Sequence, residues 1–162
     1  MRSLVISELF TALPAAGISV LRFNFRGVGA STGTYDHGDA ERLDVRAALD
    51  AVRDPGLPTL LAGWSFGADL ALSVTDPDIA AWVAIASPLR YAHDIERVAS
   101  DPRPKLLALA EHDEFRPVSE VVAEVAGWVA CETVVIGGAS HFFIGRTEAL
   151  ATAVIGWVTD RL

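Results

Sequence analysis

Short apolar runs alternate with segments of helical periodicity along most of this 162-residue sequence. Consecutive parallel strands need a crossover connection, usually a helix, whereas antiparallel strands can be joined by a short turn. The alternation therefore predicts a three-layer α/β sandwich, in which helices flank a mainly parallel sheet of about five strands. Strands are expected at residues 18–23, 58–62, 80–86, 104–110 and 131–136. Helices are expected at residues 3–16, 39–53, 66–74, 118–128 and 147–162, with a loop over 87–103.

The composition is consistent with a single folded domain over residues 1–162. A chain of this length can bury roughly two-thirds of its unfolded surface, so it needs no disulfide to fold. Cys131 is the only cysteine, which excludes an internal disulfide and a thiolate metal site and favours a reducing compartment, the cytoplasm. The formal net charge of −8 argues against nucleic acid as a partner, because no block of Lys and Arg could neutralise phosphates. No signal peptide and no membrane span are predicted.

The segment Gly63-Trp64-Ser65-Phe66-Gly67 lies between an expected strand and an expected helix. In that context a G-x-S-x-G pattern is typical of a nucleophile elbow, a tight turn that projects the serine hydroxyl from the sheet. We expect Gly63 and Gly67 to provide room for the turn. The helix that follows would direct its free N–H groups towards a developing oxyanion, and the Phe66 N–H is a candidate donor.

A serine needs an imidazole to accept its proton and an acid to orient that imidazole. Asp113 follows the strand expected at 104–110, and His141 follows the strand expected at 131–136. The order Ser65, Asp113, His141 and the position of each at the carboxyl end of a strand fit a catalytic triad in an open parallel sheet.

Each partner of Ser65 has alternatives. Glu111 and Glu114 flank Asp113 and would substitute for it if the loop turned differently. His37, His93 and His112 are expected to be loop residues, because a solvated histidine is the commonest outcome there. Asp69, in the first turn after the elbow, is interpreted as complementing the helix dipole.

Four aromatic residues near the predicted triad are candidates for an acyl pocket, although aromatic residues near a sheet usually belong to the core. They are Trp64, Phe66, Phe142 and Phe143. In the loop over 87–103, Arg90, Tyr91 and His93 could contact a substrate, but solvent exposure is the simpler expectation. The sequence does not select among ester, thioester, lactone and amide substrates.

Four segments together resemble the α/β-hydrolase superfamily, over nearly the whole chain. They are residues 20–31 (VLRFNFRGVGAS), 63–67 (GWSFG), 111–113 (EHD) and 138–143 (GASHFF). The resemblance is to a small bacterial subgroup of serine hydrolases related to dienelactone hydrolase and to serine aminopeptidase-like proteins. It implies an enzyme without a large cap domain or cofactor, with a small-molecule acyl substrate. It also implies Ser65 as nucleophile, His141 as base and Asp113 as orienting acid.

The resemblance also implies a truncated α/β-hydrolase fold. The family sheet has three further strands before the first helix expected here, and the loop after the third of them normally supplies a second oxyanion N–H. We therefore expect a truncated or misassigned start, and a weak hydrolase or an inactive remnant of one. Losing one oxyanion donor costs about 3 kcal/mol of transition-state stabilisation. Apolar surface exposed by the missing strands would favour a homo-oligomer.

Two other functions fit parts of the sequence. The glycine-rich segment 27–33 follows an expected strand, but it does not open directly into a helix as a dinucleotide-binding fingerprint does. The second alternative is a catalytically inactive, hydrolase-like binding or interaction domain. Reaction of Ser65 with a fluorophosphonate distinguishes it from a hydrolase, because an interaction domain has no need of an activated serine.

Overall fold

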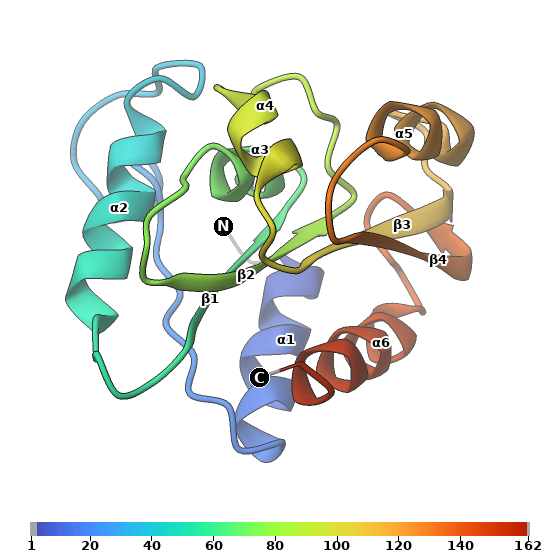
Figure 1. Cartoon of the computed structure of the whole chain (residues 1–162), viewed down its shortest axis with the longest axis horizontal. Coiled ribbons are helices and arrows are strands. Elements are labelled where there is room, and N and C mark those ends of the chain that lie inside the picture. Colours follow the sequence, from blue (N-terminus) through green and yellow to red (C-terminus); the bar gives the residue numbers. More distant parts are fainter. Residues whose placement is uncertain (1–2, 162) are drawn as a thin grey trace.

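The computed structural model describes residues 3–161, which form a three-layer α/β sandwich (Figure 1). Its sheet contains four strands: β1 (Thr59–Trp64), β2 (Ile79–Ile85), β3 (Lys105–His112) and β4 (Cys131–Ser140). All neighbouring strands pair in parallel, in the order β1-β2-β3-β4. The expected fold class is confirmed, with four strands in place of about five.

Helices cover both faces of this sheet. Helices α1 (Leu4–Ala15) and α6 (Thr147–Thr159) pack together on one face, at the bottom of Figure 1. The other face is covered by α2 (Glu41–Val52), α3 (Phe66–Leu72), α4 (Ile95–Ser100) and α5 (Val118–Val125). The expected end of the last helix, Leu162, lies outside the described residues, and α6 ends at Thr159.

Strand β2 lies in the interior of the molecule. Its residues 81–85 are at most 1% exposed, because helices cover both faces and β1 and β3 flank the strand. Side chains of alternate residues enter two separate hydrophobic clusters, Ala81, Val83 and Ile85 on the side of α6 and Trp82 and Ala84 on the side of α3. A continuous apolar run is typical of a parallel strand buried on both faces.

The strand expected at residues 18–23 is wrong. Residues 18–25 have no regular secondary structure, and the backbone N–H groups of residues 19–25 donate no hydrogen bond to another described residue. Val20 packs against the core, whereas Leu21 and Phe23 are 52% and 42% exposed. The run has the composition of a buried strand, but a strand also needs a neighbour with which to form a hydrogen-bonded ladder.

Two loop expectations also change. The segment 87–103 contains a short helix, α4, in addition to loop. Helix α2 begins at Glu41, two residues after the start expected at residue 39, and its N-cap, Ala40, has no side-chain hydrogen bond. Instead, the buried Glu41 carboxylate accepts the backbone N–H groups of Asp36 and Gly38, at 2.7 and 2.9 Å. These bonds hold the loop that leads into α2.

No helix within residues 3–161 is both long and apolar enough to cross a membrane. The longest, α6, has 13 residues, whereas a membrane-spanning helix needs about 20.

Candidate active site

The turn between β1 and α3 holds Ser65 in a strained backbone conformation. Ser65 has φ 54° and ψ −123°, a combination that residues with a side chain seldom adopt. Its N–H donates to the Ile85 carbonyl oxygen at 2.8 Å. A Cβ on Gly63 would lie 2.1 Å from the Gly67 carbonyl oxygen, whereas a Cβ on Gly67 would lie 3.8 Å from its nearest neighbour, Phe25. The turn therefore requires glycine at 63 but not at 67, where the sequence-based expectation fails.

Helix α3 begins directly after Ser65, so its first turn lies beside the serine hydroxyl. The N–H groups of Ala68 and Asp69 donate to the Ser65 carbonyl oxygen, at 2.9 and 3.3 Å. The Phe66 N–H donates to no acceptor in the described part of the chain. It is therefore available to a negatively charged oxygen bound next to Ser65, as helix N-terminal N–H groups are.

The structure brings Ser65, His141 and Asp113 together from the ends of three strands. His141 Nε2 lies 2.9 Å from Ser65 Oγ, and His141 Nδ1 lies 2.9 Å from Asp113 Oδ2. With its proton on Nδ1, the imidazole donates to Asp113 and accepts from the Ser65 hydroxyl. The side chains of His141 and Asp113 are only 6% and 7% exposed. In this arrangement the imidazole is placed to accept a proton from the serine hydroxyl.

The three acids at the end of β3 contact different groups of the loop that carries His141. Asp113 contacts the imidazole, as described above, whereas Glu114 Oε2 accepts the His141 backbone N–H at 3.0 Å. Glu111 Oε2 accepts the Gly138 N–H at 2.7 Å. Both alternatives to Asp113 therefore bind the backbone of the histidine loop. The hydrogen bond from His141 also lowers the pKa of Glu114 below its ordinary value.

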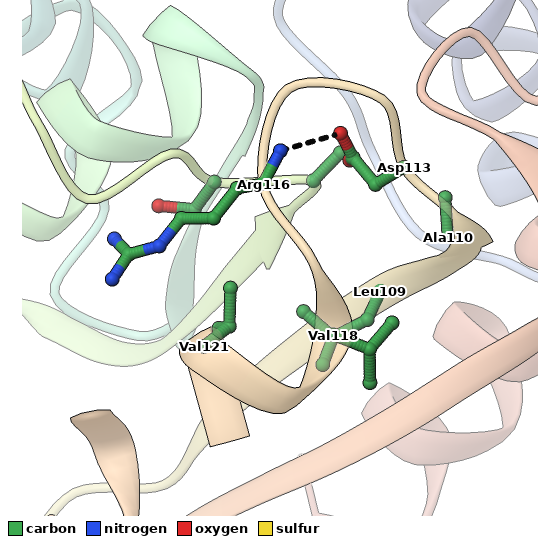
Figure 2. Close-up of a pocket in the computed structure, with 8 residues that line it drawn as sticks. Leu109, Ala110, Asp113, Arg116, Val118 and Val121 are labelled. Carbon is green, nitrogen blue, oxygen red and sulfur yellow. Dashed lines mark hydrogen bonds between the residues drawn. The ribbon is translucent and has the colours of Figure 1, made fainter. Parts of the chain in front are cut away.

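Asp113 is oriented by its own loop. Its Oδ1 accepts backbone N–H groups from Phe115 and Arg116, at 2.9 and 3.2 Å, which leaves Oδ2 for His141. Figure 2 shows the bond from the Arg116 N–H, and it shows the Arg116 side chain extending away from Asp113. The guanidinium instead donates to the Pro88 carbonyl oxygen and pairs with Glu124. It does not compete with His141 for the carboxylate.

Trp64 makes a contact with the histidine loop that sequence reasoning missed. Its indole Nε1–H donates to the His141 carbonyl oxygen at 3.0 Å, and the two rings lie 5.5 Å apart. Trp64, the residue before Ser65, thus holds the backbone of His141. The two residues are 77 positions apart in the chain, and no periodicity or motif connects them.

The other three histidines lie away from Ser65. His112, at the end of β3, is exposed and lies 3.6 Å from Glu111. His93 lies 3.6 Å from Asp39, and His37 is an exposed loop residue with φ 54°. None of them contacts the hydroxyl of Ser65. His37 and His93 lie in loops as expected, whereas His112 is the last residue of β3 and not a loop residue.

A pocket of about 340 Å³ opens beside Ser65 and His141. Its walls are mainly aromatic: Tyr35, Trp64, Phe66, Tyr91, Phe115 and Phe142. Three of the four aromatic residues proposed from the sequence thus line it, and the fourth, Phe143, is fully buried in the core instead. Tyr35 and Phe115 were not predicted. They lie in loops, and only the folded chain brings them next to Phe66 and His141.

Asp69 fixes one wall of this pocket. Its Oδ1 accepts the Ser87 hydroxyl at 2.5 Å and the Leu89 N–H at 3.0 Å, and its Oδ2 accepts the N–H groups of Arg90 and Tyr91, both at 2.8 Å. Burial raises the pKa of Asp69, and these four hydrogen bonds oppose that shift. The helix-dipole interpretation is therefore incomplete, because the carboxylate mainly anchors the loop after β2.

The glycine-rich loop at 27–33 is held in place by contacts within its own segment and with α2. Arg26 donates to Asp44 through its backbone N–H at 3.0 Å and through its guanidinium at 2.7 Å. The Ser31 hydroxyl donates to the Asn24 carbonyl oxygen at 2.9 Å. Helix α2 begins only at Glu41, so the loop does not lead directly into a helix as a dinucleotide-binding loop would.

No group of three or more His, Cys, Asp or Glu side chains in residues 3–161 is placed to hold a metal ion. Cys131 is half-buried at the start of β4, and burial raises the pKa of its thiol to about 11. The thiol is therefore protonated near neutral pH, which makes it a weak nucleophile and a weak metal ligand.

The chain is similar to a curated protein and to several solved structures. No family model matches the sequence. The chain is 31% identical to an uncharacterized protein of Rickettsia prowazekii, over 95% of this chain and 70% of that protein. It is 34% identical to an α/β serine hydrolase homologue from Coxiella burnetii, with a TM-score of 0.80 over 96% of this chain and 76% of the other.

A second solved structure is a lid-less α/β serine hydrolase from Xanthomonas campestris. It is 32% identical to this chain, with a TM-score of 0.89 over 100% of this chain and 75% of the other. A Butyrivibrio proteoclasticus protein with bound ferulic acid, Est1E, has a TM-score of 0.84 at 17% identity, which shows a similar fold alone.

Proposed function

This chain belongs to the α/β serine hydrolase superfamily, and from that premise we propose that it hydrolyses carboxylic esters or related acyl bonds. In this proposal Ser65 is the nucleophile, His141 the general base and Asp113 the acid that orients His141. The observation that carries the proposal is the continuous hydrogen-bonded chain from Ser65 Oγ through His141 to Asp113, with both distances at 2.9 Å.

The chemistry follows from this geometry. Ser65 Oγ attacks the acyl carbon while its proton moves to His141 Nε2. The tetrahedral intermediate then collapses, the bond to the leaving alcohol breaks, and His141 returns the proton to that alcohol. Water deprotonated by His141 attacks the acyl-enzyme in the same way and releases the acid. Asp113 stays ionised throughout and stabilises the imidazolium.

The oxyanion of each tetrahedral intermediate needs hydrogen-bond donors. The Phe66 N–H is the donor proposed here, because it lies at the start of α3 and has no acceptor in the described part of the chain. Each such donor contributes roughly 10²-fold to 10³-fold in rate.

Esters are the conservative choice of substrate, because the departure of their leaving group depends least on proton donation by the general acid. An apolar aromatic pocket open to solvent fits acyl or alcohol groups of moderate size. Thioesters, lactones and amides share the same first step and belong in the same substrate screen.

The test is labelling of the folded chain with a fluorophosphonate, followed by intact mass and peptide mapping. We expect one adduct, on Ser65, that is absent from Ser65→Ala and present in Ser119→Ala, which changes an exposed serine on α5. The same three proteins are assayed with 4-nitrophenyl butyrate. Circular dichroism checks that each variant is folded.

The opposite result is equally informative. A folded wild-type chain that forms no adduct and cleaves no ester would contradict the proposed function, and it would favour the alternative of an inactive binding or interaction domain. Labelling that persists in Ser65→Ala would place the reactive group elsewhere and overturn the role of Ser65.

A further inference from the structure

The mouth of the aromatic pocket contains one strongly basic side chain, Arg90, and it is the only Lys or Arg among the pocket residues. Its Nη2 lies 3.5 Å from the carbonyl oxygen of Phe115, on the opposite wall. Phe115 in turn lies 4.5 Å from the His141 ring, centroid to centroid. The guanidinium is therefore positioned between the loop after β2 and the loop that carries Asp113.

Arg90 differs from most other arginines of this acidic chain in having no acidic partner. Arg26, Arg103 and Arg116 each lie within 4.0 Å of a carboxylate. No carboxylate of residues 3–161 lies within 4.0 Å of the Arg90 guanidinium, whose single hydrogen bond is a long one to a backbone carbonyl. Its charge and most of its donors are thus open to a bound molecule.

The backbone that carries Arg90 is held firmly even though its side chain is exposed. The Arg90 N–H and the neighbouring Tyr91 N–H both donate to Asp69 at 2.8 Å, and Asp69 is fully buried. A buried carboxylate with four donors fixes this loop relative to the elbow, because breaking those bonds would leave a buried charge unpaired. Arg90 is therefore presented to the pocket from a rigid position.

A guanidinium in such a position favours a particular class of ligand. Its planar set of N–H donors matches a carboxylate in a bidentate arrangement. The side chains of Tyr91 and Phe115, which are 38% and 52% exposed, add apolar surface to the pocket that Arg90 lines, and an ion pair beside apolar surface is stronger than one in bulk solvent. In a chain of net charge −8, a cation without a partner beside the catalytic histidine would attract anionic substrates locally.

We propose that Arg90 binds a carboxylate of the substrate, so that this enzyme prefers acyl substrates that carry an anionic carboxylate apart from the scissile bond. The inference rests on the proposed function of the Ser65 site. It makes Arg90 a specificity-determining residue with no role in the proton transfers.

The experiment compares matched esters that differ in one charge. Monomethyl glutarate and methyl valerate place the carboxylate or a methyl group at the same position of the acyl chain. The pair 4-acetoxybenzoate and 4-methylphenyl acetate does so on the alcohol side. We expect kcat/KM to favour the anionic member of one pair by about twofold to fivefold, a typical effect of a partly exposed ion pair. That preference should decrease as NaCl is raised from about 50 to 500 mM.

The variants separate charge from packing. Arg90→Met keeps an unbranched side chain of similar length, and it should lower kcat/KM for the anionic ester until the preference over the neutral ester is lost. Arg97→Met, on the exposed face of α4, is the matched control and should keep the preference. The proposal would be overturned if, for both pairs of esters, the ratio of kcat/KM for the anionic ester to kcat/KM for the neutral ester were the same in the wild type and in Arg90→Met.

A binding measurement keeps this test independent of turnover. Ligand-observed NMR with Ser65→Ala should detect monomethyl glutarate more strongly than methyl valerate, and the double variant with Arg90→Met should lose that difference. If no ester were cleaved, the proposed function would fail while this measurement still decided the role of Arg90. Equal binding of the two esters by Ser65→Ala, together with measurable turnover, would reject the role of Arg90 alone.

Discussion

At the scale of single residues, the turn around Ser65 depends on one glycine more than on the other. Gly63→Ala would place a methyl group 2.1 Å from the Gly67 carbonyl oxygen, so the turn would have to open. Overpacking typically lowers the free energy of unfolding by about 1–3 kcal/mol, and we expect a loss in that range here. Gly63→Ala should therefore lower the thermal unfolding temperature and abolish fluorophosphonate labelling.

Gly67→Ala is the matched comparison for that prediction. Its new methyl group would meet Phe25 at an ordinary distance of 3.8 Å, and alanine favours a helix over glycine by about 1 kcal/mol. Labelling and stability should both be retained. Equal damage from the two substitutions would show that the close approach of Gly63 to Gly67 is not what holds the elbow.

The proposal that Asp113, and not Glu114, is the acid that orients His141 can be tested by comparing substitutions of the two residues. Asp113→Asn would present an amide to His141 Nδ1 and favour the wrong tautomer, so kcat/KM should fall by roughly 10³-fold to 10⁴-fold. Glu114→Gln keeps an oxygen that can accept the His141 backbone N–H, and we expect less than about a fivefold change. Steady-state kinetics on one ester compares them. A larger loss in Glu114→Gln than in Asp113→Asn would reverse the two roles.

At the scale of elements, the Arg26–Asp44 pair joins the glycine-rich loop to α2. The hydrogen bond from Arg26 lowers the pKa of Asp44 below its ordinary value of 3.8. A carboxylate with a lowered pKa in the folded state stabilises it above the unfolded pKa, and that stabilisation is lost as the pH falls through the folded pKa. The pair should therefore contribute at neutral pH and cease to contribute well below pH 4.

Thermal unfolding of Asp44→Asn against the wild type measures this contribution. The variant should unfold roughly 2 °C lower at pH 7, a shift typical of one partly exposed ion pair in a chain of this size. The difference should shrink as the pH falls below about 4. Asp160→Asn, at the exposed end of α6, controls for a general effect of charge. A gap that stayed constant from pH 7 to pH 3 would mean that Asp44 is not held ionised by Arg26.

An element can be predicted from the sequence more easily when its hydrogen bonds are local than when they depend on a distant strand. The helices satisfy most of their backbone groups locally, and β2 and the first six residues of β3 are mainly apolar runs within the core. Composition and periodicity therefore located these elements, except the short helix α4. Residues 18–25 have the same composition as a strand. Whether they form one depends on a neighbour at the same register, and no local pattern encodes that neighbour.

At the scale of the whole molecule, the site is assembled from the carboxyl ends of β1, β3 and β4. Parallel strands bring these ends to one edge of the sheet, so the sequence order Ser65, Asp113, His141 was sufficient to predict their proximity. The supporting contacts of Trp64 with His141 and of Asp69 with the loop after β2 were not predictable. They depend on side-chain directions across the assembled sheet, which chain order does not specify.

Backbone hydrogen bonding differs between the central strands and residues 19–25, and this difference predicts how stability is distributed through the molecule. Amides of β2 and β3 bond within the central sheet and are buried, so their hydrogen exchange should be slowest and should approach the global unfolding rate. The N–H groups of residues 19–25 donate to no described residue, and peptides covering them should exchange almost as fast as an unfolded reference.

Hydrogen exchange followed by mass spectrometry tests this contrast, with a peptide from β2 and one from residues 18–25 compared in the same digest. A chain unfolded in denaturant gives the intrinsic exchange rates. Protection of residues 18–25 comparable to that of β2 would contradict the prediction, because it would require backbone hydrogen bonds to a further strand. Repeating the measurement over a range of protein concentration would then identify a second copy as that strand, since protection supplied between copies rises with concentration, whereas protection within one chain does not.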